Sequence, residues 1–252
     1  MESGDVVVNH KGQVSWITFS HPQHNSMPSS QLSKLTETIL VEGADRDTKV
    51  IVLQSAGDRT FCAGANFTEL ATINSLDTGK RFFGGFASVI MAIRDCNKLV
   101  IGRVQGKAVG GGVGLLAATD YCMATKWASL RLSELSIGIG PFVIEPAISR
   151  KTGKAGFIQL ALNPVEWQTA EWANHHGLYQ SVFDTSESMD EHLRKYVDSL
   201  ASYSEDALLQ MKRLLWEGTE NWSSLLAKRA EKSARLLLNQ DTQQLIQSFI
   251  SS

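Results

Sequence analysis

The sequence has few cysteines, little net charge and no long apolar run, and each of these absences excludes a class of protein. The three cysteines, Cys62, Cys96 and Cys122, show neither the spacing of a metal site nor that of a disulfide framework. We therefore expect buried, reduced thiols, as in a cytoplasmic protein. The net charge is −2 with lysine and arginine spread along the chain, which argues against a nucleic-acid partner.

Membrane, metal and nucleotide sites also lack their sequence signals. No apolar run approaches the ~20 residues of a membrane span, and the polar, acidic residues 1–5 do not resemble a signal peptide. Apart from the adjacent His175 and His176, the histidines have no metal-ligand spacing. The chain contains no P-loop, dinucleotide-binding glycine motif or nucleophile elbow. We expect no metal, no separate cofactor and no membrane contact.

Buried strands alternate with helices along the first two thirds of the chain. Residues 6–9 and 13–20, separated by Lys11 and Gly12, predict a β-hairpin. Further strands are predicted at residues 49–54, 98–105, 121–125, 129–132 and 180–184, and helices at residues 29–44, 77–96 and 170–177. This alternation is typical of an α/β fold with crossover connections.

The last quarter of the chain changes to helices. A capping-box pattern at residues 188–191 predicts a helix start, and further helices are expected at residues 204–216 and 220–238. We therefore divide the chain into a core, residues 1–187, and a C-terminal helical segment, residues 188–252. The apolar side chains of that segment fit either an internal core or a contact with another subunit.

Two segments rich in small residues are the most informative feature. Residues 61–67 read Phe-Cys-Ala-Gly-Ala-Asn-Phe, and residues 109–114 read Val-Gly-Gly-Gly-Val-Gly, each where an apolar run gives way to a helix. Glycine and alanine let the main chain approach a ligand closely, and a helix N-terminus leaves N–H donors free. Two such turns together stabilise negative charge on a carbonyl oxygen. The alternative is that the glycines only let a helix pack closely on a strand.

These two segments, in this order and spacing, resemble the oxyanion-hole segments of the crotonase family, the enoyl-CoA hydratase/isomerase group. The resemblance covers residues 6–221 and includes the turn at residues 22–27 and the stretch at residues 131–141. It implies a crotonase-like spiral of ββα units, with C-terminal helices that contact neighbouring subunits and help close the site. It also implies a homotrimer or a dimer of trimers, and an acyl-CoA thioester as substrate, of which coenzyme A is a part.

The same resemblance assigns roles to individual residues. The backbone N–H groups of Ala65 and Gly111 correspond to the donors for the thioester oxygen. Glu134 corresponds to the second catalytic glutamate of the family's hydratases, and its apolar neighbours predict a raised pKa. An exposed loop glutamate is the alternative for Glu134. The substrate's CoA portion would lie against Ala63, Asn66, Phe67 and Gly110. Phe82, Phe83 and Phe86 fit either the floor of an acyl pocket or ordinary core.

The chain departs from the hydratase pattern at Gly114, where those enzymes have their first catalytic glutamate. A glycine provides no carboxylate, so the usual pair that activates water is incomplete. Family members with a single glutamate include enoyl-CoA isomerases, and some decarboxylating members also lack the first one. Glu145, at an expected helix start, is the candidate for a second carboxylate. The alternative for Glu145 is a favourable interaction with the helix dipole.

We therefore expect an acyl-CoA enzyme that stabilises a thioester enolate. The prevalence of hydratases in the family favours an enoyl-CoA hydratase of fatty or branched acyl-CoA metabolism. Gly114 favours the first alternative, a single-glutamate isomerase or decarboxylase. The second alternative is a non-catalytic paralogue that binds acyl-CoA.

Overall fold

A six-stranded sheet forms the centre of the protein, and the computed structural model describes residues 4–251. Its strands, in the order β1-β2-β3-β5-β7-β9, are β1 (Asp5–Lys11), β2 (Val14–Ser20), β3 (Val50–Ser55), β5 (Leu99–Val104), β7 (Tyr121–Thr125) and β9 (Ser181–Phe183). The pair β1–β2 is antiparallel, which confirms the predicted hairpin, and every later pair is parallel.

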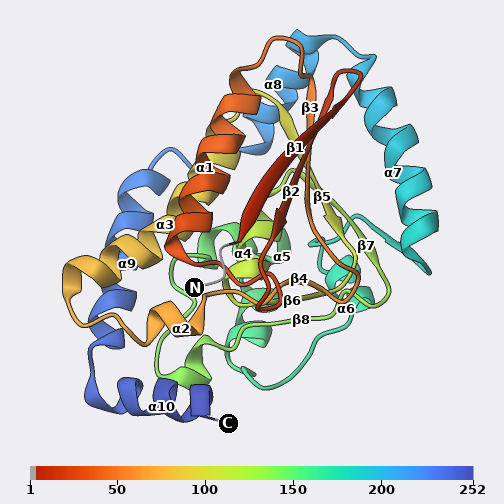
Figure 1. Ribbon diagram of the computed structural model, residues 1–252. Coiled ribbons are helices and arrows are strands. Elements are labelled where there is room, and N and C mark those ends of the chain that lie inside the picture. Colours follow the sequence, from red (N-terminus) through yellow and green to blue (C-terminus); the bar gives the residue numbers. More distant parts are fainter. Residues whose placement is uncertain (1–3, 252) are drawn as a thin grey trace.

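A smaller parallel sheet lies across one end of the larger one (Figure 1). It consists of β4 (Thr60–Cys62), β6 (Lys107–Val109) and β8 (Leu130–Arg131), in that order. Along the chain, β3 is followed by β4, β5 by β6 and β7 by β8. Each pair thus places its first strand in the large sheet and its second in the small one before the chain turns into a helix. This repeated ββα winding is the predicted spiral.

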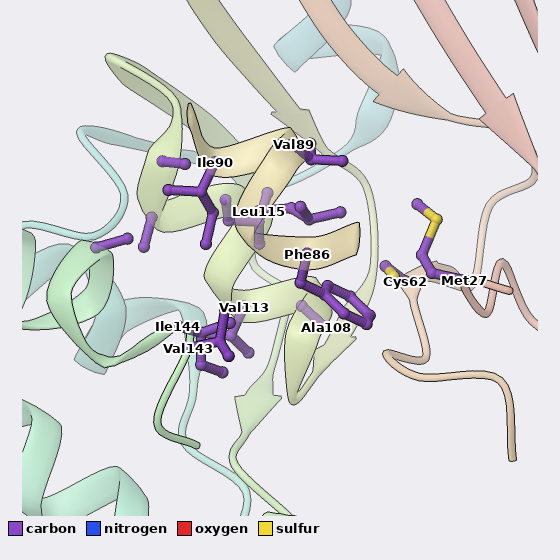
Figure 2. Packing of buried hydrophobic residues seen from close by; sticks show 14 of the residues in the cluster. Met27, Cys62, Phe86, Val89, Ile90, Ala108, Val113, Leu115, Val143 and Ile144 are labelled. Atoms are coloured by element: carbon purple, nitrogen blue, oxygen red, sulfur yellow. The ribbon is translucent and has the colours of Figure 1, made fainter. Parts of the chain in front are cut away.

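Helices cover both faces of the larger sheet, with α1 and α3 on one side and α7 on the other (Figure 1). The helices before the C-terminal region are α1 (Ser29–Ala44), α2 (Phe67–Leu70), α3 (Leu76–Asp95), α4 (Gly111–Ala118), the 3₁₀ helix η1 (Glu134–Ile137), α5 (Glu145–Ala161) and α6 (Ala170–His175). The largest apolar cluster lies between the sheets and α1, α3, α4 and α5. Phe86, Cys62 and Ile144 are among its members (Figure 2).

Four helices complete the chain: α7 (Ser186–Ala201), α8 (Glu205–Leu215), α9 (Trp222–Leu237) and α10 (Gln240–Ser251). The predicted helix start at Ser188 is wrong, because Thr185 is the N-cap and Ser188 is its capping-box partner. The division after residue 187 therefore falls inside α7. Met189, Leu193 and Val197 of this helix pack on the large sheet in a second apolar cluster.

Some apolar residues of the C-terminal helices are buried in the core, and others are exposed. Leu226 and Leu237 of α9 are buried in the chain's own core, where α9 packs along α3. Met211 and Leu215 of α8 are exposed. Within residues 4–251, no helix combines the length and the apolar character that a bilayer span requires.

Candidate active site

Three segments that are far apart in the sequence meet at the small sheet. Ala65 follows β4, Gly111 follows β6 and Glu134 follows β8. Because the carboxyl ends of parallel strands lie at one edge of a sheet, the order β4-β6-β8 brings these segments together. Six residues predicted for the site line one pocket at this edge: Ala63, Ala65, Phe67, Gly110, Gly111 and Glu134.

The two segments of small residues touch each other. A Cβ atom on Gly64, which has a φ of 85°, would lie 2.7 Å from the Val109 carbonyl oxygen and 3.5 Å from the Gly111 nitrogen. Gly111 is the first residue of α4, so its N–H group has no acceptor within that helix. Among the described residues, neither the Ala65 nor the Gly111 N–H group donates a hydrogen bond. Two main-chain donors are therefore available at the pocket.

Glu134 provides the only carboxyl group among the described residues that line this pocket. Its Oε2 is buried and has no hydrogen-bond partner in the described part of the chain. Burial raises the pKa of Glu134 to about 7, against a smaller lowering by its own backbone N–H group. A carboxyl with this pKa is populated in both protonation states near neutral pH, so it can accept a proton and return it.

The remaining walls of the pocket are mostly apolar. Phe83 and Phe86 of α3 belong to them, whereas Phe82 does not, and the segment before α5 contributes further apolar side chains. Within the described lining, the polar side chains other than Glu134 are Ser133 and Ser233, and no lysine, arginine or histidine is present. The pocket thus suits an uncharged acyl chain beside a single carboxyl.

Ile144 fills the space next to Gly114. A Cβ atom on Gly114 would lie 2.2 Å from Cγ2 of Ile144 and 2.5 Å from its Cβ. Figure 2 shows Val143 and Ile144 in the same part of the cluster as Val113, the α4 residue before Gly114. An isoleucine therefore stands where a longer side chain on α4 would extend.

Residues 9–249 match the sequence model described as enoyl-CoA hydratase/isomerase. The chain belongs to the enoyl-CoA hydratase/isomerase family. Membership makes it an enzyme of the lyase or isomerase type and implies an acyl-CoA thioester as substrate. The spiral described above is the crotonase fold.

Named relatives and solved structures agree with this assignment. The chain is 28% identical over 247 residues to the bacillaene synthase dehydratase PksH of Bacillus subtilis (strain 168), covering 94% of this chain and 87% of that protein. It is 25% identical over 253 residues to the short-chain-enoyl-CoA hydratase of Clostridium acetobutylicum, covering 99% of this chain and 96% of that protein. The enoyl-CoA hydratase structure from Bacillus halodurans superposes with a TM-score of 0.90 at 20% identity, covering 96% of this chain and 99% of that structure's chain.

Glu145 is not among the residues that line the pocket of this enoyl-CoA hydratase/isomerase family member. Its carboxylate is ion-paired with Lys154 and Arg229 and accepts a hydrogen bond from Ser149 Oγ at 2.6 Å. Burial raises the pKa of Glu145, but the hydrogen bonds from Lys154, Ser149 and Arg229 outweigh it and lower the pKa to about 2. The Glu145 carboxylate thus links α5 to α9 and lies outside the pocket lining to which Glu134 belongs.

Asn66 also lies outside the pocket lining. Its Oδ1 accepts a hydrogen bond from the Glu69 N–H group at 2.9 Å and so caps α2. Its Nδ2 donates to Gln23 Oε1 at 2.7 Å and to Ser26 Oγ at 3.0 Å. The Asn66 side chain therefore holds the turn at residues 22–27 against the first small-residue segment.

Sequence reasoning missed several contributors to the pocket. Ile144 and Ser233 both line it, and Ser233 comes from α9, far along the chain from Glu134. No motif marks Ser233. The signal for Ile144 was indirect, because a glycine inside an apolar helix such as α4 often indicates that another side chain packs closely against it.

Proposed function

We propose that this enzyme moves a carbon–carbon double bond in an acyl-CoA thioester, converting a 3-enoyl-CoA into a 2-enoyl-CoA. The observation that carries this proposal is a single buried carboxyl, Glu134, in a pocket whose other walls are mainly apolar. A double-bond shift requires only one group that removes a proton and returns it. Fatty or branched acyl chains without charge fit these walls.

In the proposed reaction the thioester oxygen accepts hydrogen bonds from the N–H groups of Ala65 and Gly111. Each such donor contributes on the order of 3 kcal/mol to transition-state stabilisation. Glu134 takes a proton from C2, and the C–H electron pair spreads over the dienolate. Glu134 then gives that proton to C4 while the double bond settles between C2 and C3. Atoms and charge balance without a further reactant.

Hydration of a 2-enoyl-CoA is the second candidate, favoured by a specific observation. The relative that aligns over 99% of this chain is named a short-chain-enoyl-CoA hydratase. Hydration needs a positioned water molecule, and family hydratases position it with two carboxylates. Here Gly114 lacks one, and Glu145 is held by Lys154 and Arg229. Glu134 would have to orient and deprotonate the water alone, which makes hydration the weaker candidate.

Two other functions fit the pocket less well. A decarboxylase must bind a substrate carboxylate, and among the described lining residues no cation offsets the cost of burying it next to Glu134. A non-catalytic paralogue has no use for a carboxyl buried without a partner, since such a group lowers stability when it is ionised.

The assembly and location are proposed on the family resemblance. We propose a homotrimer or a dimer of trimers in the cytoplasm, with coenzyme A entering only as part of the substrate. The exposed Met211, Leu214 and Leu215 of α8 are the candidate contact with a second subunit. Light scattering after size-exclusion chromatography measures the assembly directly, and a monomer contradicts this part of the proposal.

The reaction is tested with three substrates: a 3-enoyl-CoA, crotonyl-CoA and 3-methylglutaconyl-CoA. Liquid chromatography with mass detection separates the outcomes. An isobaric product from the 3-enoyl-CoA, with the absorbance of a conjugated thioester, supports isomerisation. A product heavier by one water from crotonyl-CoA, without isomerisation, supports hydration. Loss of carbon dioxide contradicts both candidates, and binding without any product indicates a non-catalytic paralogue.

A further inference from the structure

Ile144 makes the closest approach to α4 at the position where family hydratases carry their first glutamate. A Cβ atom on Gly114 would overlap both Cγ2 and Cβ of Ile144, at 2.2 Å and 2.5 Å. Ile144 is only 4% exposed, and it lines the pocket that contains Glu134. An apolar side chain from the neighbouring segment therefore occupies the space beside Gly114.

We infer that Ile144 determines the outcome of the reaction, because it keeps water away from Glu134 and from the enolate. This inference rests on the proposed isomerisation and adds the residue that separates it from hydration. Ile144 acts on the reacting atoms by occupying space, so it is a specificity-determining residue rather than a proton carrier.

The side chains around Ile144 in the pocket are mainly apolar. A buried water typically needs two to four polar partners, and apolar cavities stay dry. Within the described lining, the side chains that could hydrogen-bond water are Ser133, Glu134 and Ser233. The Glu134 Oε2 is buried and has no partner among the described residues. Ile144 fills the volume beside Gly114, where family hydratases have their first glutamate and where water would otherwise approach.

The chain fixes Ile144 in this place from several directions. Its carbonyl oxygen accepts a hydrogen bond from the Ile148 N–H group at 3.2 Å, in the first turn of α5. The next residue, Glu145, is ion-paired with Arg229 of α9. Arg229 Nη1 also donates to the Phe142 carbonyl oxygen at 3.0 Å. Since a β-branched side chain has few rotamers, this anchored backbone keeps the isoleucine against Gly114.

A dry pocket has a measurable consequence for the migrating proton. If Ile144 keeps water away, the proton that Glu134 removes from C2 stays on the carboxyl until it reaches C4. In deuterium oxide, the 2-enoyl-CoA formed by the wild type should therefore retain mainly the hydrogen of the substrate. An opened pocket should let solvent deuterium replace it.

The test compares wild type and Ile144→Ala during isomerisation of a 3-enoyl-CoA in deuterium oxide, with the deuterium content of the product read by mass. We expect Ile144→Ala to raise the deuterium per product molecule roughly threefold or more. Ile148→Ala is the matched control, since Ile148 is buried one turn further along α5 and does not line the pocket. It should leave the deuterium content at the wild-type value. Ile144→Ala that isomerises with unchanged deuterium content overturns the inference.

A second variant tests the same residue independently of isomerisation. Gly114→Glu combined with Ile144→Ala restores a carboxylate and frees the space that it needs. This double variant should add water to crotonyl-CoA at least roughly tenfold faster than wild type, as expected for an added general base. Rapid hydration by the wild type overturns the inference even if the oxyanion site is correct. Absence of isomerisation in every variant, with hydration only in the double variant, rejects the proposed reaction but supports the role of Ile144.

Discussion

A Cβ atom on Gly110 would lie 2.8 Å from Oε1 of Glu134. The two residues follow neighbouring strands of the small sheet, β6 and β8, and the Gly110 N–H group donates to the Arg131 carbonyl oxygen at 3.0 Å. Gly110 has a φ of 51° and a ψ of −121°, a conformation that only glycine adopts readily. The residue that turns the chain into α4 therefore also leaves room for the buried carboxyl.

Gly110→Ala should lower turnover at least roughly tenfold, because its methyl group would push the Glu134 carboxyl out of place and a 1 Å displacement at a site can cost about a hundredfold. The backbone strain alone costs about 1–3 kcal/mol of stability. Gly57→Ala is the control, since Gly57 also has a positive φ, 81°, but has open space around its Cβ position. Thermal melts of both variants report the backbone strain at the substituted glycine. Steady-state kinetics report the displacement of the Glu134 carboxyl. Equal loss of turnover in both would contradict this account.

Glu134→Gln should reduce turnover by a factor on the order of a hundred to ten thousand, since an amide cannot carry the proton. The affinity for a saturated acyl-CoA should change little, because the thioester is held by main-chain donors and apolar walls. Turnover is measured by product mass and affinity by calorimetry. Turnover that survives this substitution would remove Glu134 from its proposed role.

The same substitution should increase stability at alkaline pH. Burial raises the pKa of Glu134 to about 7 from its ordinary value of 4.5. The stability that the neutral carboxyl contributes is therefore fully present below pH 4.5 and is lost as the pH rises through about 7. Above that pH the ionised carboxyl costs about 3 kcal/mol relative to the neutral form. In urea unfolding at pH 5 and pH 8, the free energy of unfolding of Glu134→Gln relative to wild type should be higher at pH 8 by roughly that amount. A pH-independent difference between the two proteins would be inconsistent with a raised pKa.

Glu145→Gln should affect the fold more than the chemistry. The lowered pKa of Glu145, about 2, means that its stabilising contribution is present above its ordinary value and is lost only as the pH falls toward 2. At neutral pH the variant should lose about 1–3 kcal/mol of unfolding free energy, because Arg229 loses its charged partner. Turnover should fall far less than in Glu134→Gln. Glu37 is exposed, so Glu37→Gln serves as the control for a surface glutamate. If Glu145→Gln instead lost as much turnover as Glu134→Gln, Glu145 would be a catalytic carboxylate.

Much of this architecture follows from local sequence signals. The helix predicted at residues 29–44 has the observed bounds of α1, and the hairpin agrees to within a residue or two, because their apolar periodicity and turns are local features. Glu134 and the small-residue segments were also predictable, since each follows a strand of the small sheet directly. That the three segments meet follows from the strand order, which only the family resemblance supplied.

The sequence could not show which distant side chains meet. Arg229 pairs with Glu145 across 84 residues, and nothing near Glu145 indicates that partner. The overlap of Ile144 with the Gly114 position depends on how α4 packs against α5. The start of α7 was misplaced because Thr185 and Ser188 form a capping box without the usual glutamate or glutamine.

A crystal structure with a non-reactive acyl-CoA thioester tests the central claim most directly. We predict that the thioester oxygen lies about 2.7–3.2 Å from both the Ala65 and Gly111 nitrogens, the normal range for an N–H···O hydrogen bond. The C2 atom should face the Glu134 carboxyl, with Ile144 on its other side. A thioester oxygen bonded to neither nitrogen, or a Glu134 side chain directed away from C2, would contradict the account.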